Sequence, residues 1–192
     1  MAIVALGRAG QADAALAALA TLERERPGGA RAALRCYNAA LDACGRDRSD
    51  GALARSVALL RELEARGGVA PDVVSFNTVI AACERRAEWR VALRLLRAMR
   101  TERYGGLRPD RISYNAAISA CAKGAQPGRA LALLREMAAE HDAGGGGPAP
   151  DVVSYSAAIS ACAAAGGGDA GARRALALLD EMRARSAPTS SA

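Results

Sequence analysis

The sequence repeats itself at intervals of 38 to 41 residues. Four segments share an aromatic residue, a polar residue directly after it and a cysteine six residues further on: they are LRCYNAALDAC from Leu34, VVSFNTVIAAC from Val73, RISYNAAISAC from Arg111 and VVSYSAAISAC from Val152. The polar residues of the series are Asn38, Asn77, Asn115 and Ser156, at spacings of 39, 38 and 41. A repeat of this length indicates a solenoid, in which each unit packs mainly on its neighbours.

Each unit holds two amphipathic runs of helical length. In the unit from Val73, the apolar faces are Phe76, Val79, Ile80 and Cys83 in the first run, and Ala92, Leu93, Leu96 and Met99 in the second. Apolar residues at i, i+3, i+4 and i+7 are typical of a helix with one buried face. Aromatic residues make up only 3% of the chain, while helix-forming Ala, Leu and Arg are abundant. The pattern predicts an all-α fold.

The repeats divide the chain into units. We expect an incomplete unit over residues 1–33, complete units over 34–72, 73–110 and 111–151, a unit without its closing residues over 152–185, and a disordered tail over 186–192. Residues 26–33 are expected to form the first loop between units, and residues 173–185 the last helix. The clipped first unit and the absent final Pro-Asp favour a fragment of a longer array, with flanking repeats missing.

Composition limits the classes of function. The net charge of +6 favours a polyanionic partner, although a solvated basic surface is the alternative. The repeated cysteines fall on the apolar stripe, where a small thiol packs well, and the one histidine, His141, is expected in a loop. We therefore predict buried structural cysteines, no metal site and no cofactor. No apolar run is long enough to span a membrane, and no membrane partner is expected.

The units resemble the pentatricopeptide repeat family, as a P-type array. The resemblance rests on VVSFN from Val73, the small residues and Cys that end the first helix, ALRLLRAM from Ala92, and the closing Pro109-Asp110, and it covers essentially the whole chain. It implies a right-handed α-solenoid of helix-turn-helix repeats that binds single-stranded RNA, one base to a repeat. It also implies action in a mitochondrion or chloroplast, in RNA processing, stability or translation.

The resemblance assigns base reading to the residue after the aromatic together with the last residue of the repeat. The implied pairs are Asn38 with Asp72, Asn77 with Asp110, and Asn115 with Asp151, and Ser156 is the reading residue of the next unit. In the family Asn with Asp favours uracil, so three consecutive uracils are expected. An Asn amide offers both a donor and an acceptor to the edge of a base, and a nearby carboxylate can orient it.

Two further sets of residues are expected at the RNA. The resemblance assigns clamping of each base to Val74, Ile112 and Val153, while Arg35 departs from the pattern in its unit. Cations recur two residues after the cysteine, or at the matching place in the first unit: Arg8, Arg46, Arg85 and Lys123. Repeated cations at the end of the first helix suit phosphate contacts.

Other interpretations of these residues stay open. The Asp residues, or Ser75, Ser113 and Ser154, would also serve as helix N-caps, and the cations would also suit helix C-termini. The chain contains no His-x-Glu motif and no residues outside the repeats that would build a catalytic site, so we predict no enzyme and no small-molecule substrate. The alternative to RNA binding is a solenoid scaffold that binds protein partners.

Overall fold

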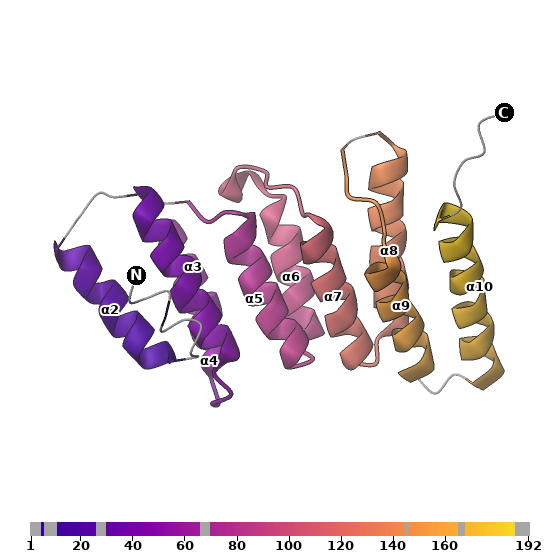
Figure 1. Ribbon diagram of the computed structural model, residues 1–192, viewed down its shortest axis with the longest axis horizontal. Helices are drawn as coiled ribbons and strands as arrows, with labels where there is room; N and C mark the ends of the chain where they lie inside the picture. Colours follow the sequence, from indigo (N-terminus) through magenta and orange to yellow (C-terminus); the bar gives the residue numbers. More distant parts are fainter. Residues whose placement is uncertain are drawn as a thin grey trace.

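The computed structural model describes residue 5 and residues 11–25, 30–65, 70–144, 146–164 and 168–186 (Figure 1). The described elements are α2 (Ala12–Glu25), α3 (Ala30–Arg46), α4 (Ala52–Ala65), α5 (Val73–Arg85), α6 (Trp89–Met99), the 3-10 helix η1 (Glu102–Tyr104), α7 (Arg111–Lys123), α8 (Pro127–Asp142), α9 (Val152–Ala164) and α10 (Gly168–Ser186). No strand occurs in these ranges. The predicted all-α solenoid is confirmed.

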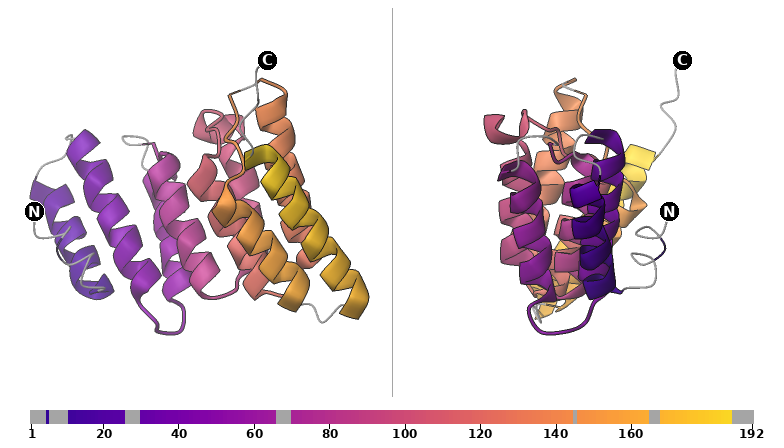
Figure 2. Two further views of the ribbon diagram at one scale, coloured as in Figure 1. Left: turned by 45° about the vertical axis from the view of Figure 1, so that its right-hand side comes forward. Right: turned by 90° about the vertical axis from the view of Figure 1, so that its left-hand side faces the viewer.

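The helices pair in sequence order, and the pairs stack (Figure 2). The first helices of successive repeats, α3, α5, α7 and α9, contact each other in series and form a continuous layer. Each second helix packs against the first helix of its own repeat, and α4, α6 and α8 also contact the first helix of the next repeat. Among the described residues, the backbones of the second helices do not approach one another closely. The stack is therefore joined through its first helices.

The core repeats with the sequence. The aromatic residues of the first helices are almost completely buried, and so are the cysteines seven residues further on: the two series are Tyr37, Phe76, Tyr114 and Tyr155, and Cys44, Cys83, Cys121 and Cys162. Burial raises the pKa of the Cys83 thiol to about 12 and that of the Cys121 thiol to about 11. It also raises the pKa of the Tyr114 hydroxyl. The four cysteines are buried packing residues, as the sequence predicts.

The connections between repeats also contribute to packing. After α6, the segment that leads to α7 contains η1, whose Tyr104 ring packs edge-on against Phe76 with 4.9 Å between the ring centroids. The Tyr104 hydroxyl donates a hydrogen bond of 2.9 Å to Glu64 in α4. This contact between an inter-repeat segment and the preceding repeat is absent from the sequence pattern, because Tyr104 occurs in only one unit.

Three local predictions are wrong. Part of the expected loop 26–33 is helical, because α3 begins at Ala30. Ala33 and Cys36 occupy the positions that Asp72 and Ser75 hold in the next unit. The first complete unit therefore has no capping pair that would start its helix at position 34. His141 lies in the last turn of α8 and not in a loop, since helix-forming residues continue to Asp142.

The third error concerns the last helix. α10 begins at Gly168, five residues before the predicted Arg173, and Asp169 lies in its first turn, where a carboxylate suits the positive end of the helix dipole. Residues 187–192 of the expected tail lie outside the described residues, whereas Ser186 ends α10. Leu176 on this helix is exposed.

Two turns inside repeats share an unusual backbone. Ala87, between α5 and α6, and Ala125, between α7 and α8, have φ values of 56° and 52°. Just before the second turn, Gly124 lies against the Trp89 ring, and a Cβ added to Gly124 would clash with Trp89 Cδ1. Gly124 therefore allows the second helix of one repeat to approach the turn of the next.

We predict that Gly124→Ala destabilises the protein by about 1–3 kcal/mol, because the added methyl group forces the Trp89 ring to move. Urea unfolding followed by circular dichroism measures the change. Gly128→Ala is the matched control: no atom lies within 4 Å of a Cβ at Gly128, in the first turn of α8, so no loss is expected. Equal losses in the two variants would contradict the steric account.

Candidate nucleic-acid interface

An aspartate caps the first helix of each of two successive repeats. Asp72 precedes α5 and Asp110 precedes α7, and both have extended backbone angles. Each carboxylate accepts a hydrogen bond of 2.8 Å from the backbone N–H of the serine three residues later, Ser75 or Ser113. That serine's hydroxyl accepts in return from the aspartate N–H. This is a capping box, and it assigns the cap to the aspartate.

Asp151 makes the same contacts before α9. Its carboxylate accepts from Ser154 N at 3.0 Å, and its N–H donates to Ser154 Oγ at 3.1 Å. Partial burial raises the pKa of Asp151, but hydrogen bonds from Ser154 and Asn115 and the charge of Arg111 outweigh this effect and hold the pKa below its usual value. The carboxylate is therefore ionised at neutral pH and acts only as an acceptor.

Each capping aspartate also contacts the asparagine of the repeat that it closes. Asn77 Nδ2 donates to both oxygens of Asp110, at 3.0 and 3.2 Å. Asn38 Nδ2 donates to Asp72 at 3.3 Å, and Asn115 Nδ2 donates to Asp151 at 3.1 Å. The structure thus brings together all three pairs that the sequence assigns to base reading.

The serine of the capping box holds the other end of the amide. The hydroxyls of Ser75, Ser113 and Ser154 donate to Oδ1 of Asn38, Asn77 and Asn115, each at 2.6 Å. A hydroxyl has one proton, and the contact with the amide is shorter than the contact with the aspartate carboxylate, so the proton goes to the amide oxygen. Sequence reasoning treated these serines only as possible caps; their recurrence two residues before the Asn position was the available signal.

The contacts leave part of each amide unused. A side-chain amide has two N–H donors and two acceptor lone pairs on its oxygen. The aspartate takes one N–H and the serine takes one lone pair, so one donor and one acceptor remain in a fixed orientation. Asn77 is 9% exposed, which leaves a narrow polar edge for a ligand.

Exposed apolar residues lie one helical turn before the amides. Val74, Ile112 and Val153 are 56%, 62% and 55% exposed, and they precede Asn77, Asn115 and Ser156 by three residues. Residues at i and i+3 share a helix face. Large apolar side chains on a free surface have no packing role within the fold, which fits the expected contact with a base.

The first complete unit departs from this arrangement. Arg35 occupies the apolar position and is exposed, and Cys36 stands where the later units have the serine, but well inside α3 because that helix begins at Ala30. Ser156, the expected reading residue of α9, is exposed as well. Asn38 nevertheless has its full set of contacts, because Asp72 closes its unit and Ser75 comes from the following unit.

The expected phosphate contacts are only partly available. Arg46, Arg85 and Lys123 lie in the last turns of α3, α5 and α7, while Arg8 lies outside the described residues. Arg46 forms an ion pair with Asp42 at 2.9 Å, and Lys123 forms one with Glu84 at 2.9 Å. Arg85 donates to the Gly45 carbonyl at 3.3 Å. A phosphate contact by Arg46 or Lys123 would therefore require the side chain to leave its carboxylate partner.

The part of the chain that the structure describes has no group of three metal-ligating side chains close enough to hold an ion. None of the described helices combines the length and the apolarity that a transmembrane span requires.

The family models and the solved structures that the chain resembles all contain pentatricopeptide repeats. Residues 71–123 match the PPR repeat family and residues 112–140 match the PPR repeat. The fold is similar to the crystal structure of the pentatricopeptide repeat protein PPR10 from maize, with 31% identity and a TM-score of 0.68, over 95% of this chain but 23% of PPR10. PPR10 in complex with an 18-nucleotide RNA element matches with 30% identity and a TM-score of 0.61, over 94% of this chain and 26% of that one.

A more distant structure supports the fold alone. The PPR domain of Arabidopsis thaliana protein-only RNase P 1, in complex with tRNA, has 15% identity and a TM-score of 0.72, over 98% of this chain and 89% of that domain. No curated protein sequence matches the chain.

We predict that Ser113→Ala lowers the free energy of unfolding by about 1–3 kcal/mol, because it removes half of a capping box and leaves the buried Asn77 oxygen without its donor. Ser160→Ala, at an exposed position of α9, is the control and should change stability little. Thermal unfolding of both variants makes the comparison. A Ser113→Ala variant as stable as the control would contradict the bridging role.

Proposed function

Because the chain belongs to the pentatricopeptide repeat family, we propose that it binds single-stranded RNA and reads one base with each of three Asn–Asp pairs. The observation that carries the proposal is the repeated geometry. In three successive repeats an asparagine amide is held at one end by the aspartate that closes its own repeat and at the other end by a serine of the next repeat, and it keeps one donor and one acceptor unused.

The unused amide edge matches the edge of a pyrimidine. Uracil presents carbonyl oxygens and an N–H on its Watson–Crick edge, so it can accept from the amide N–H and donate to the amide oxygen. The aspartate fixes the orientation of the amide group. A carboxylate can only accept hydrogen bonds, so the amide must turn its Nδ2, and not its Oδ1, towards the aspartate. We propose uracil at the positions read by Asn38, Asn77 and Asn115.

The apolar side chains give the proposal a source of affinity. Val74, Ile112 and Val153 expose aliphatic surface beside the reading positions, and a base placed against them would remove that surface from water. Contact through the flat face of a base does not distinguish between bases, whereas the amide edge does. Affinity and selectivity would thus come from different side chains.

The family resemblance extends the proposal to RNA stability, processing or translation in a mitochondrion or chloroplast. The proposed activity is binding without a chemical step. The chain spans about a quarter of the PPR10 structures that it matches, and PPR10 itself is described in complex with RNA. Three reading pairs address a short stretch of RNA, so the proposal concerns what this part of an array contributes.

The direct test is titration with fluorescent oligo-U, oligo-A, oligo-C and oligo-G of equal length at several salt concentrations. We predict the tightest binding for oligo-U. Log affinity should fall with log salt at about −0.7 per phosphate contact, hence at roughly −3 if all four cations contact RNA. A slope of about −1.4 would mean that Arg46 and Lys123 keep their carboxylates. Equal or absent binding to all four oligonucleotides would remove the base-reading proposal.

We predict that Asp110→Asn moves the preference of one position from uracil towards cytosine, the direction that family usage gives. The new amide can donate as well as accept, so it no longer fixes Nδ2 of Asn77. Asparagine caps helices about as well as aspartate, so the stability of α7 should change little. Competition among oligo-U strands that carry a single cytosine at each position measures the shift.

The neighbouring repeat supplies the matched control. Asp72→Asn should produce the same change one nucleotide away, because Asp72 orients Asn38 and not Asn77. Asp180→Asn, at an exposed position of α10, should leave the preference unchanged at every position. A cytosine preference at the same nucleotide in the Asp72 and Asp110 variants would contradict a one-base-per-repeat reading.

A further inference from the structure

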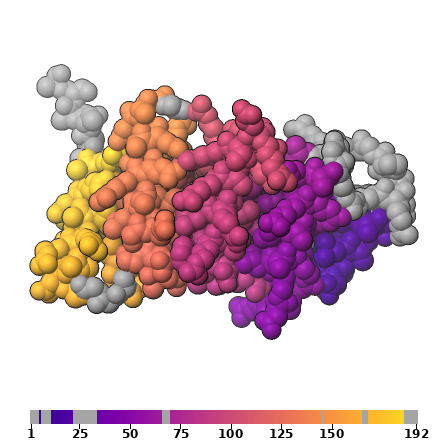
Figure 3. All heavy atoms as spheres, turned by 180° about the vertical axis from the view of Figure 1, so that it is seen from behind, coloured from indigo at the N-terminus to yellow at the C-terminus, as the bar shows by residue number. Residues whose placement is uncertain are grey.

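The second helices leave open grooves on the side away from the first-helix layer (Figure 3). Two adjoining cavities of about 670 and 540 Å³ lie between α4 and α6. Both are lined by Val57, Arg61, Val91 and Arg94, so they form one continuous depression, which we call the outer groove. In the described residues the backbones of these two helices do not approach each other closely, so the groove follows from the spacing of successive repeats.

The floor of the outer groove is apolar. Leu60 and Leu95 form its deepest part at 1% and 9% exposure, and Val57, Val91 and Ala98 are half-buried above them. The two helices that contribute these residues belong to different repeats. A ligand with apolar side chains would therefore bury surface against both repeats at once.

The walls of the outer groove are basic. Arg94 of α6 lies on one wall and Arg61 of α4 on the opposite wall. Arg61 and Arg94 form no ion pair and no side-chain hydrogen bond with any described residue. Arg103, at one end, is paired with Glu64, and Glu88, at the other end, is the only acid among the described lining residues. The groove thus carries an excess of positive charge beside an apolar floor.

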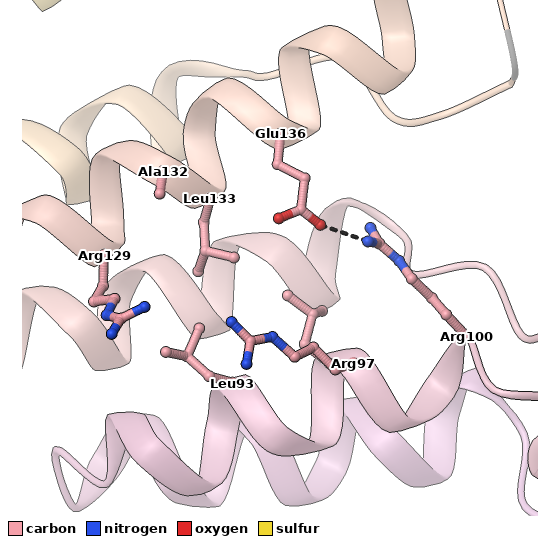
Figure 4. A pocket seen from close by; sticks show the side chains of 8 residues that line it. Leu93, Arg97, Arg100, Arg129, Ala132, Leu133 and Glu136 are labelled. Atoms are coloured by element: carbon pink, nitrogen blue, oxygen red, sulfur yellow. Dashed lines mark hydrogen bonds and ion pairs between the residues drawn. The ribbon is translucent and has the colours of Figure 1, made fainter.

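The next groove along the stack also has an apolar floor, but it is smaller and part of its charge is neutralised. The pocket between α6 and α8 has a volume of about 340 Å³, and Figure 4 shows Arg97 and Arg129 reaching into it above Leu93 and Leu133. There Arg100 forms ion pairs with Glu136 at 2.5 Å and with Glu140 at 2.6 Å. Part of the charge is therefore neutralised within the protein, which makes the α4–α6 groove the stronger candidate.

We propose that the outer groove binds an acidic amphipathic helix of a partner protein. Such a helix has apolar residues at i, i+3, i+4 and i+7 for the floor, and carboxylates on both flanks for Arg61 and Arg94. Nucleic acid fits this groove less well than peptide, because a sugar–phosphate chain would meet the charged walls but leave the half-buried Val57 and Val91 uncovered. The groove lies on the opposite layer from Asn38 and Asn77, so partner and RNA would bind together.

The test uses a fluorescein-labelled helical peptide with leucines at i, i+3, i+4 and i+7 and glutamates at the other positions. A scrambled peptide of the same composition has the same charge but no apolar stripe. We expect the amphipathic peptide to bind and saturating oligo-U not to displace it. Equal binding of the scrambled peptide would show a surface that binds polyanions generally, and displacement by oligo-U would make nucleic acid the occupant; either result overturns the proposal.

Charge reversal locates the site. Arg61→Glu with Arg94→Glu should weaken the amphipathic peptide by about tenfold or more, with oligo-U binding unchanged, because the carboxylates of the peptide then meet like charges. Arg135→Glu with Arg174→Glu makes the same change in net charge at exposed positions of α8 and α10 outside the groove, and should not weaken the peptide. Circular dichroism confirms folding of both variants. Equal weakening by the two pairs would overturn the assignment.

Discussion

The structure depends on one carboxylate shared between neighbouring repeats. Asp110, the last residue of its repeat, caps α7 of the next repeat through Ser113 and at the same time orients Asn77 of its own repeat. The cap satisfies backbone donors at a helix start, and the bridge satisfies the polar atoms of a largely buried amide. Helix initiation, repeat-to-repeat contact and orientation of the reading amide are therefore parts of one hydrogen-bond network, and none of them can vary without the others.

Periodicity made most of the fold predictable, because the same apolar faces recur in every unit and each unit needs a neighbour to cover them. The reading pairs were also predictable as pairs, since their spacing follows from the repeat. The sequence did not predict whether Asp72 or Ser75 caps α5, because both residue types cap helices. Only the structure shows that the two residues act together in a capping box. The start of α3 at Ala30 could not be predicted for the opposite reason. Ala33 and Cys36 lack the carboxylate and hydroxyl that mark a helix start in the later units.

The cations show which ion pairs can be predicted from the sequence and which cannot. The pairing of Arg46 with Asp42 spans four residues of one helix and was visible in the sequence. The pairing of Lys123 with Glu84 joins residues from two different repeats, so it depends on how the helices stack. The outer groove depends on stacking in the same way, because its two walls come from α4 and α6. A periodic sequence predicts what each unit contains more readily than what lies between units.

Because each reading site takes its asparagine from one unit and its serine from the next, the sites straddle the sequence boundaries. Tandem duplication of any stretch one period long would rebuild a complete site at the new junction, wherever the crossover fell, since the copied segment always supplies whichever half is missing. The repeating unit of the proposed RNA recognition is therefore defined by its length and not by a particular pair of end residues. An array with this geometry can lengthen its target by unequal recombination without passing through a form that has a broken site.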